Sequence, residues 1–255
     1  MYPPRLEITG IVGIPEINEG DQLGTMIFQA ATHQGYPIKP GDIIVVTQKV
    51  VSKGEGRTVS LSTIEPSPEA KEISIASGKD SRLIELILSE SREIIRRDDS
   101  RGIIITETRH GFICANAGID TSNVPGHDTV SLLPLDPDAS ANTILMNIQR
   151  EAGFDQIGVI ITDTFGRAWR QGQVNFAIGV GGIEPLVDYR GQLDTIGGEL
   201  SATVIAVADE IAAVSELVMG KTDAVPAAIV RGYSFKATGA GVSPLLRDKA
   251  EDLFR

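Results

Sequence analysis

Short runs of apolar β-formers, each bounded by Gly, Pro, Asn or Asp, recur along the whole chain. Runs of this length between turn residues are typical of buried β-strands. The predicted strands are 6–12, 43–46, 103–105, 112–114, 157–162, 173–180 and 226–230. The runs at 103–105 and 112–114 are close enough to form a hairpin.

Apolar residues at helical spacing occupy the segments between these strands. Ser67 as an N-cap and Pro68 at the first helical position begin one helix, while Gly153 and Gly220 each follow the end of another. The predicted helices are 22–31, 67–78, 83–97, 140–153 and 200–219. Because helices and strands mix without strict alternation, the predicted fold class is α+β, or mixed α/β.

The segment 158–172 (GVIITDTFGRAWRQG) carries the strongest chemical signal. Its apolar run stops on Asp163 and Thr164, and Arg167 and Arg170 follow at once. A carboxylate, a hydroxyl and two guanidinium groups at a strand's carboxyl end are typical of metal and phosphate sites. Taken alone, Asp163 fits the N-cap of a following helix equally well.

The segment 116–137 is rich in Asn, Asp, Ser and Pro and is too long for a plain connection. It brings Asp120, Ser122 and Asn123 close together, a pattern that also fits an Asx-turn in a surface loop. Considered jointly, Asp120 and Asp163 are two carboxylates on separate segments near strand ends. Such pairs commonly hold Mg²⁺ or Mn²⁺ beside nucleotide phosphates.

Lys49 and Lys53 follow the strand 43–46 and lie one helical turn apart. A solvated positive face and a phosphate contact explain this pair equally well. The chain as a whole has a net charge of −11, with 23 Lys and Arg against 34 Asp and Glu. This balance disfavours a nucleic-acid partner, because such binding depends on cationic side chains that neutralise phosphates.

Two motifs resemble nucleotide-binding loops but have the wrong context. The segment 215–222 (SELVMGKT) is one residue from a Walker A loop, yet a predicted helix precedes it and a strand follows, the reverse of the required order. Gly179 to Gly182 is followed by Glu184 and Pro185 instead of the glycine and helix of a dinucleotide fingerprint. This run indicates a tight turn with close backbone packing.

The composition is typical of a globular protein, with 255 residues and 42% apolar residues. A single cysteine, Cys114, excludes an intramolecular disulfide and a cysteine-based zinc site, and it fits a reducing compartment. The N-terminus lacks the features of a signal peptide, and no run approaches the roughly 18 apolar residues of a membrane span. We therefore expect a cytoplasmic protein with no membrane partner.

Six segments of the chain resemble the coenzyme F420-0:L-glutamate ligase family, also called the F420-0 gamma-glutamyl ligases. They are 41–57 (GDIIVVTQKVVSKGEGR), 116–124 (NAGIDTSNV), 133–138 (LPLDPD), 158–172, 206–213 (AVADEIAA) and 219–232. NAGIDTSNV and ITDTFGR together are highly specific, and the match runs in one order from residue 13 to residue 232. Some relatives carry an additional reductase-like domain after this region, whereas this chain ends at Arg255, which favours the stand-alone form.

The resemblance implies a single domain over 1–255 that can divide into two intertwined subdomains with a discontinuous boundary. It also implies an intertwined homodimer. The implied activity is GTP-dependent addition of L-glutamate to the lactyl carboxylate of coenzyme F420-0, then of further gamma-linked glutamates. Divalent Mg²⁺ or Mn²⁺ and K⁺ are the implied cofactors.

By the same resemblance, Asp120, Asp163 and Thr164 would bind the divalent metal ion. The residues implied for GTP are Ile14, Pro15, Glu16, Ile17, Gln48, Lys49, Lys53, Asn123, Met219, Gly220 and Lys221. The family has a metal-binding Glu directly after the Met-Gly of the last loop, where this chain has Lys221 and is one residue shorter. Asp223 is the candidate substitute for that ligand.

The implied mechanism transfers the γ-phosphoryl group of GTP to a carboxylate, and glutamate then attacks the acyl phosphate. Such transfer depends on positioning and charge neutralisation, with Asp120 and Asp163 holding metal and Lys49, Lys53 or Arg167 offsetting charge. No nucleophile is required, which agrees with the lack of a Ser/His/Asp or Cys/His pattern. Two rival functions remain, a metal-dependent phosphohydrolase and a nucleotide-binding regulator without turnover.

Overall fold

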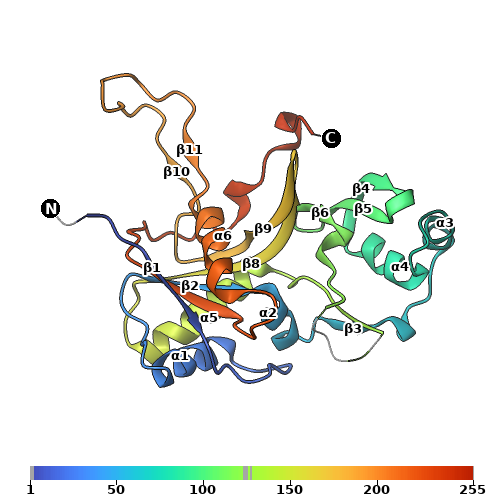
Figure 1. The fold of residues 1–255 in the computed structure, drawn as a ribbon, viewed down its shortest axis with the longest axis horizontal. Coiled ribbons are helices and arrows are strands. Elements are labelled where there is room, and N and C mark those ends of the chain that lie inside the picture. The colour runs from blue at the N-terminus through green and yellow to red at the C-terminus, as the bar shows by residue number, and fades with distance from the viewer. Residues whose placement is uncertain (1–2, 123–125, 127, 255) are drawn as a thin grey trace.

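The computed structural model describes residues 3–122, 126 and 128–254, which form two lobes side by side (Figure 1). The larger lobe contains residues 3–57 and 133–254. The smaller lobe is the segment between them, so the chain leaves the larger lobe and returns to it. The buried apolar residues form two clusters that follow the two lobes, except that Phe112 of the smaller lobe packs into the cluster of the larger one. The mixed α/β class predicted from the sequence is confirmed.

A mixed five-stranded sheet is the centre of the larger lobe, with strand order β1-β12-β2-β8-β9. Only β2 and β8 run parallel, and the other neighbouring strands are antiparallel. The strands are β1 (Glu7–Ile11), β2 (Asp42–Thr47), β8 (Ile157–Arg167), β9 (Arg170–Gly181) and β12 (Ala227–Arg231).

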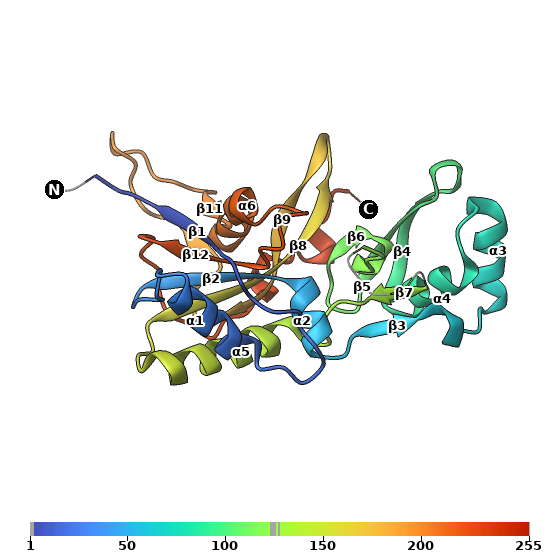
Figure 2. The same cartoon turned by 60° about the horizontal axis from the view of Figure 1, so that its bottom comes forward.

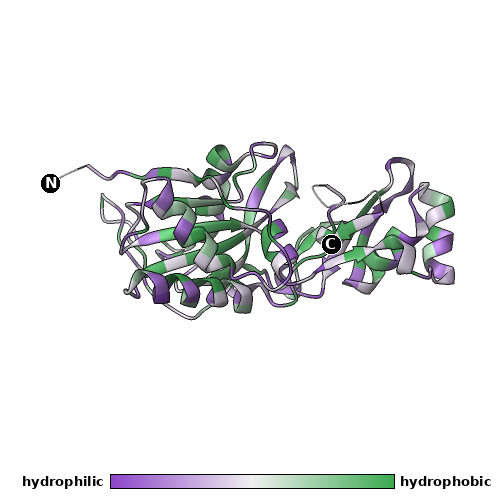
Figure 3. Cartoon of the chain, turned by 90° about the horizontal axis from the view of Figure 1, so that it is seen from below, coloured by the Kyte–Doolittle hydropathy of each residue, from purple (hydrophilic) through white to green (hydrophobic). Residues whose placement is uncertain are grey.

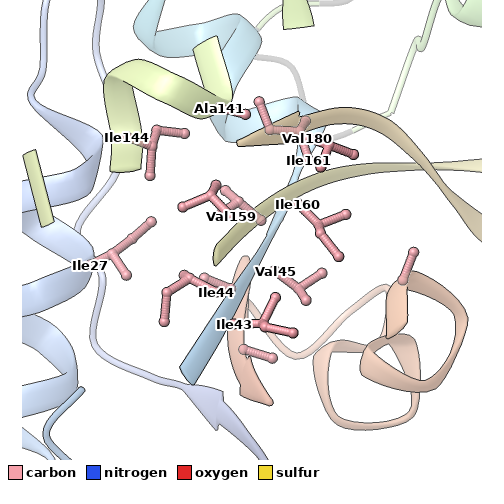
Figure 4. Packing of buried hydrophobic residues seen from close by; sticks show 14 of the residues in the cluster. Ile27, Ile43, Ile44, Val45, Ala141, Ile144, Val159, Ile160, Ile161 and Val180 are labelled. Carbon is pink, nitrogen blue, oxygen red and sulfur yellow. The ribbon is translucent and has the colours of Figure 1, made fainter. Parts of the chain in front are cut away.

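Helices cover both faces of this sheet (Figure 2). One face carries α1 (Leu23–His33) and α5 (Pro137–Ala152), and the other carries α6 (Val207–Met219). Because both faces are covered, the central strands are continuous apolar runs. Ile43 to Val46 and Val159 to Ile161 are completely buried (Figure 4). Colouring by hydropathy shows the same apolar strands within a more polar shell (Figure 3).

The smaller lobe begins after α2 (Gln48–Gly54) and combines two helices with short sheets. Its outgoing and returning segments, β3 (Thr58–Ser60) and β7 (Thr129–Ser131), pair with each other. The remaining elements are α3 (Pro68–Ser77), α4 (Ser81–Ser89), β4 (Ser91–Asp98), β5 (Ile103–Thr108) and β6 (Ile113–Ala115). Arg57 ties the lobes together at this crossing: its guanidinium donates to the Leu133 carbonyl at 3.0 Å and to Glu90 at 2.9 Å.

A two-stranded arm projects from the larger lobe (Figure 1). It consists of β10 (Val187–Asp188) and β11 (Val204–Ile205), which pair antiparallel. Leu193 and Ile196 lie in the connecting loop and are 70% and 92% exposed. None of the helices in the described ranges is long and apolar enough to span a membrane.

Most of the predicted elements are confirmed, and two helices are corrected. The segment 83–97 is not one helix, because α4 ends at Ser89 and β4 begins at Ser91. β4 pairs with β5, and this pairing outweighs the helical spacing of its isoleucines. The predicted helix 200–219 begins only at Val207, since Val204 and Ile205 pair with β10 instead.

Glycines allow the helices to approach each other and the sheet closely. A Cβ at Gly179 on β9 would lie 2.3 Å from the Pro137 carbonyl oxygen of α5. Gly182, with φ of +75°, then turns the chain. The predicted close backbone packing of Gly179 to Gly182 is therefore confirmed, but the predicted turn is confined to Gly182, because Gly179 to Gly181 belong to β9. On α1, a Cβ at Gly24 would lie 2.5 Å from the Ile144 carbonyl oxygen of α5.

We predict that Gly24→Ala destabilises the protein by about 1–3 kcal/mol, because its methyl group forces α1 and α5 apart. In a free helix the same change would stabilise by about 1 kcal/mol, so the sign of the effect tests the packing. Urea denaturation measures it. Gly239→Ala is the control, because Gly239 has no positive φ and no atom within 4 Å of its Cβ position. Higher stability of Gly24→Ala would contradict the close helix contact.

Candidate functional site

A cleft of about 880 Å³ lies where the two lobes meet. The larger lobe contributes the segment 14–17, helix α2, strand β8 and the loop after α6. The smaller lobe contributes residues 115–122, apart from Ala117 and Thr121. Segments far apart in the sequence therefore converge on one space, and most of the residues predicted to bind a nucleotide or a metal line it.

The cleft opens where the parallel pairing of β2 and β8 ends. The last paired residues are Thr47 and Thr162. Beyond them β2 passes into α2, whereas β8 continues with β9 as its only partner as far as Arg167. Asp163 and Thr164 thus follow the last parallel pair, although the strand does not end there as predicted but runs on to Arg167. They lie within a strand, so the alternative of a helix N-cap is wrong.

Asp163 is an unusual carboxyl group. The pKa of Asp163 is raised to about 7 in total: burial is the largest cause and the charge of Asp120 adds to it, whereas a backbone hydrogen bond from Thr164 and the charges of Lys221 and Lys49 oppose the shift. The side chain lines the cleft. A carboxyl group that lines a cleft and whose pKa lies near neutral pH is a candidate functional group.

Asp120 reaches the cleft from the smaller lobe and has the opposite character. Its carboxylate accepts a hydrogen bond from the Lys49 ammonium at 2.7 Å and another from the Ser122 backbone amide at 2.7 Å. Burial opposes ionisation, but these hydrogen bonds outweigh it, so the pKa of Asp120 is lowered. The contact between Lys49 and Asp120 links the two lobes across the cleft.

The cationic side chains predicted from α2 both line the cleft. Lys49 also donates to the Ser122 hydroxyl at 2.7 Å, and Lys53 forms an ion pair with Glu16 of the segment 14–17. One helical turn separates the two lysines, as predicted. With Lys221 from the loop after α6, they give a negatively charged protein a local group of cations, which can attract an anionic ligand.

The loop that begins at Met219 closes another side of the cleft. Helix α6 precedes it and β12 follows, so the rejection of a Walker A loop is confirmed. Gly220, with φ of +60°, ends the helix. The Lys221 ammonium then donates to Thr164 Oγ1 at 2.6 Å and pairs with Glu216 Oε1 at 2.9 Å.

Four of the predicted residues are not placed at the cleft wall. Gln48, the first residue of α2, is fully buried and accepts a hydrogen bond from Ser52 of the same helix at 2.8 Å. Arg167 donates to the Gln171 carbonyl oxygen at 2.9 Å, and Asp223 packs against Gly220, so neither lines the cleft. Asn123 lies outside the described residues.

Two residues at the site were missed by sequence reasoning. Glu216 lines the cleft from the last turn of α6, and the nearly buried Asn175 of β9 joins it to Thr164. The only signal for Asn175 was a polar residue within an otherwise apolar run. Glu216 gave no signal, because its role depends on contacts between α6, β8 and β9.

The donor atoms of the cleft are hard oxygens. Within the described ranges, no group of three or more His, Cys, Asp and Glu side chains forms a ready-made metal site. Asp120, Asp163 and Thr164 instead provide two carboxylates and a hydroxyl. This set suits an ion such as Mg²⁺, which typically takes one or two carboxylates and completes its shell with waters and substrate phosphates.

Comparison with known proteins gives a consistent result. A family model described as F420-0:Gamma-glutamyl ligase matches residues 11–232. The coenzyme F420:L-glutamate ligase of Methanothermobacter thermautotrophicus is 46% identical over 253 residues, which cover 98% of this chain and 99% of that protein. The proteins of the same name from Methanopyrus kandleri and Methanocaldococcus jannaschii are 43% and 40% identical, over 99% and 98% of this chain and 98% and 97% of their own lengths. This chain therefore belongs to the F420-0:gamma-glutamyl ligase family.

Proposed function

We propose that this protein is a GTP-dependent ligase that joins L-glutamate to the lactyl carboxylate of coenzyme F420-0 and then adds further gamma-linked glutamates. The names of the relatives support the reaction. The observation that carries the proposal is the cleft itself, where Asp120 and Asp163 face a common space together with Lys49, Lys53 and Lys221. Carboxylates for a metal ion and cations for phosphates are the parts that phosphoryl transfer requires.

The proposed chemistry has two steps. A carboxylate oxygen of F420-0 attacks the γ-phosphorus of GTP, so a P–O bond forms, the bond to GDP breaks and an acyl phosphate results. The neutral amine of glutamate then attacks the acyl carbon: the C–N bond forms, the C–O bond to phosphate breaks, and the proton lost from nitrogen leaves with the inorganic phosphate. The protein contributes positioning and electrostatic stabilisation and forms no covalent bond to the substrate.

A divalent cation, Mg²⁺ or Mn²⁺, would supply charge that neutralises the transferring phosphoryl group. Asp120 and Asp163 are the residues that would hold it, and Thr164 would join them only if its oxygen is released by the Lys221 ammonium. The raised pKa of Asp163 supports this role, because a buried carboxyl that is costly to ionise alone gains most from a nearby cation. K⁺ as a second cofactor stays a prediction from the family resemblance.

We assign the phosphate contacts to Lys49 and Lys53, because α2 places both at the cleft wall. The segment 14–17 and the loop from Met219 both line the cleft and would contact the nucleotide. Arg167 remains a candidate for offsetting charge only if it leaves its contact with Gln171. Asp223 would have to move away from Gly220 in the same way to serve as a metal ligand.

We further propose that the protein works as an intertwined homodimer in the cytoplasm. The arm formed by β10 and β11 supports the dimer, because it projects from the larger lobe and exposes Leu193 and Ile196. An exposed apolar arm is a natural element for exchange between subunits. Analytical ultracentrifugation measures the oligomeric state directly.

The function is tested by mass spectrometry of F420-0 after incubation with the protein, GTP, Mn²⁺ and L-glutamate. We expect mass increments of one or more glutamate residues that require all components. Phosphate release from GTP without glutamate, and with no increment, would indicate the phosphohydrolase instead. Nucleotide binding without any turnover would indicate the regulator.

Asp163→Asn separates the metal role of Asp163 from its effect on stability. The pKa of Asp163 is raised in the folded protein, so the proton is bound more tightly there than in the unfolded chain. The stability that it contributes is present at low pH and is lost as the pH rises through about 7. At pH 8 in EDTA, we expect the melting temperature of the variant to lie several degrees above that of the wild type. Each kcal/mol in the free energy of unfolding shifts the melting temperature by about 2–4 °C.

At pH 4 the two proteins should melt at similar temperatures, because the side chain at position 163 is then neutral in the folded state of both. The same variant should lose ligase activity, since an amide cannot supply the carboxylate charge for the metal ion. Equal melting temperatures at pH 8 would contradict the buried, destabilising carboxylate. Full activity at low Mn²⁺ would remove Asp163 from the metal site.

Lys49→Met tests the proposed phosphate contact while keeping most of the side-chain volume. We expect kcat/KM for GTP to fall by about 10- to 100-fold, which corresponds to about 1.4–2.7 kcal/mol of lost transition-state stabilisation. Lys249→Met is the matched control, because Lys249 pairs with Glu93 on the surface of the smaller lobe and does not line the cleft. An equal effect of both substitutions would argue against a specific role of Lys49.

A further inference from the structure

Lys221 is held in a set of oxygen atoms from three different elements, which we name the oxygen cradle. Its ammonium lies 2.6 Å from Thr164 Oγ1 on β8, 2.9 Å from Glu216 Oε1 on α6 and 3.5 Å from Asn175 Oδ1 on β9. The cradle therefore combines a hydroxyl, a carboxylate and an amide oxygen. These are the hard oxygen donors that cations such as Mg²⁺, Ca²⁺ and ammonium groups prefer.

Asn175 sets the orientation of the cradle. It is 3% exposed and lies directly across from Thr164 in the pairing of β8 with β9. Its Oδ1 accepts the Thr164 hydroxyl proton at 2.7 Å, and its Nδ2 donates to Glu216 Oε2 at 2.8 Å. Because Thr164 has one proton and gives it to Asn175, its oxygen presents only lone pairs to the cleft.

A plain surface ion pair does not explain this arrangement. An exposed pair between Lys221 and Glu216 would contribute little to stability, and it would not need a buried amide that orients both Thr164 and Glu216. The Lys221 ammonium is also close enough to Asp163 for its charge to lower the pKa of that carboxyl. It thus balances the negative charge of Glu216 and Asp163 in one corner of the cleft.

We propose that the Lys221 ammonium is a tethered cation of the cleft. It occupies the oxygen cradle that would otherwise attract a free cation, and its open side faces the space where anionic phosphates would bind. The statement about phosphates rests on the proposed function, whereas the occupation of a cation site by Lys221 does not. The protein would then carry in its own chain a positive charge that would otherwise depend on the ions in solution.

Removal of this charge should expose the cation site. Lys221→Ala leaves Glu216 and the lone pairs of Thr164 open to the cleft, and ammonium is the probe because it matches the lost group. We compare ammonium chloride with tetramethylammonium chloride at equal ionic strength, since the larger ion has no N–H donors. In ligand-free protein, we expect ammonium to raise the melting temperature of Lys221→Ala by about 2–5 °C relative to tetramethylammonium.

The wild type should show no such difference, because its cradle is already occupied. Lys249→Ala controls for the loss of a surface lysine. Adding Glu216→Gln to Lys221→Ala removes the charge of the cradle and should abolish the response to ammonium. Identical ammonium responses of the wild type and Lys221→Ala, or a response that survives Glu216→Gln, would overturn the tethered cation.

Ligase activity provides the second readout. In tetramethylammonium chloride, we expect Lys221→Ala to lose at least about tenfold in kcat/KM for GTP, and ammonium to restore most of it. A thermal response without a ligase reaction in the wild type would refute the proposed function but leave the cation site standing. A thermal response with no rescue of an active ligase would refute the role toward phosphates.

Discussion

The parallel pairing of β2 and β8 is the constraint on which the rest of the structure depends. Both strands are apolar and completely buried over most of their paired length, so their register is fixed by the core on both faces of the sheet. The pairing ends at Thr47 and Thr162. From this level, one strand passes into a helix that carries cationic side chains, and the other continues with Asp163 and Thr164. Cationic side chains and a carboxyl group therefore meet in the cleft, because the pairing of both strands ends at the same level.

Each lysine that lines the cleft is paired with a carboxylate in this structure. Lys49 contacts Asp120, Lys53 contacts Glu16 and Lys221 contacts Glu216. In the proposed function, a nucleotide phosphate that enters with its metal ion would exchange partners without leaving charge uncompensated: the Asp120 carboxylate would turn to the metal and the Lys49 ammonium to the phosphate. Because Asp120 belongs to the smaller lobe, this exchange would also couple ligand binding to the contact between the lobes.

The sequence predicted the strands well because they are short apolar runs between turn residues, and it placed Asp120, Asp163, Lys49 and Lys53 at one site. It could not predict that β4 is a strand, since its isoleucines also fit helical spacing and only pairing with β5 decides. Nor could it find Asn175 and Glu216. Their roles arise from hydrogen bonds across elements, and such contacts leave no local pattern in the sequence.

The most direct test of this account is the ionisation of Asp163, measured by carboxyl ¹³C NMR of protein labelled at aspartate, with Asp163→Asn to assign the signal. In EDTA, Asp163 should titrate with a pKa near 7. With Mg²⁺ and GDP present, it should stay ionised well below that pH, because the bound cation stabilises the carboxylate. Titration near pH 4 in EDTA, or a titration that Mg²⁺ and GDP leave unchanged, would contradict the central claim.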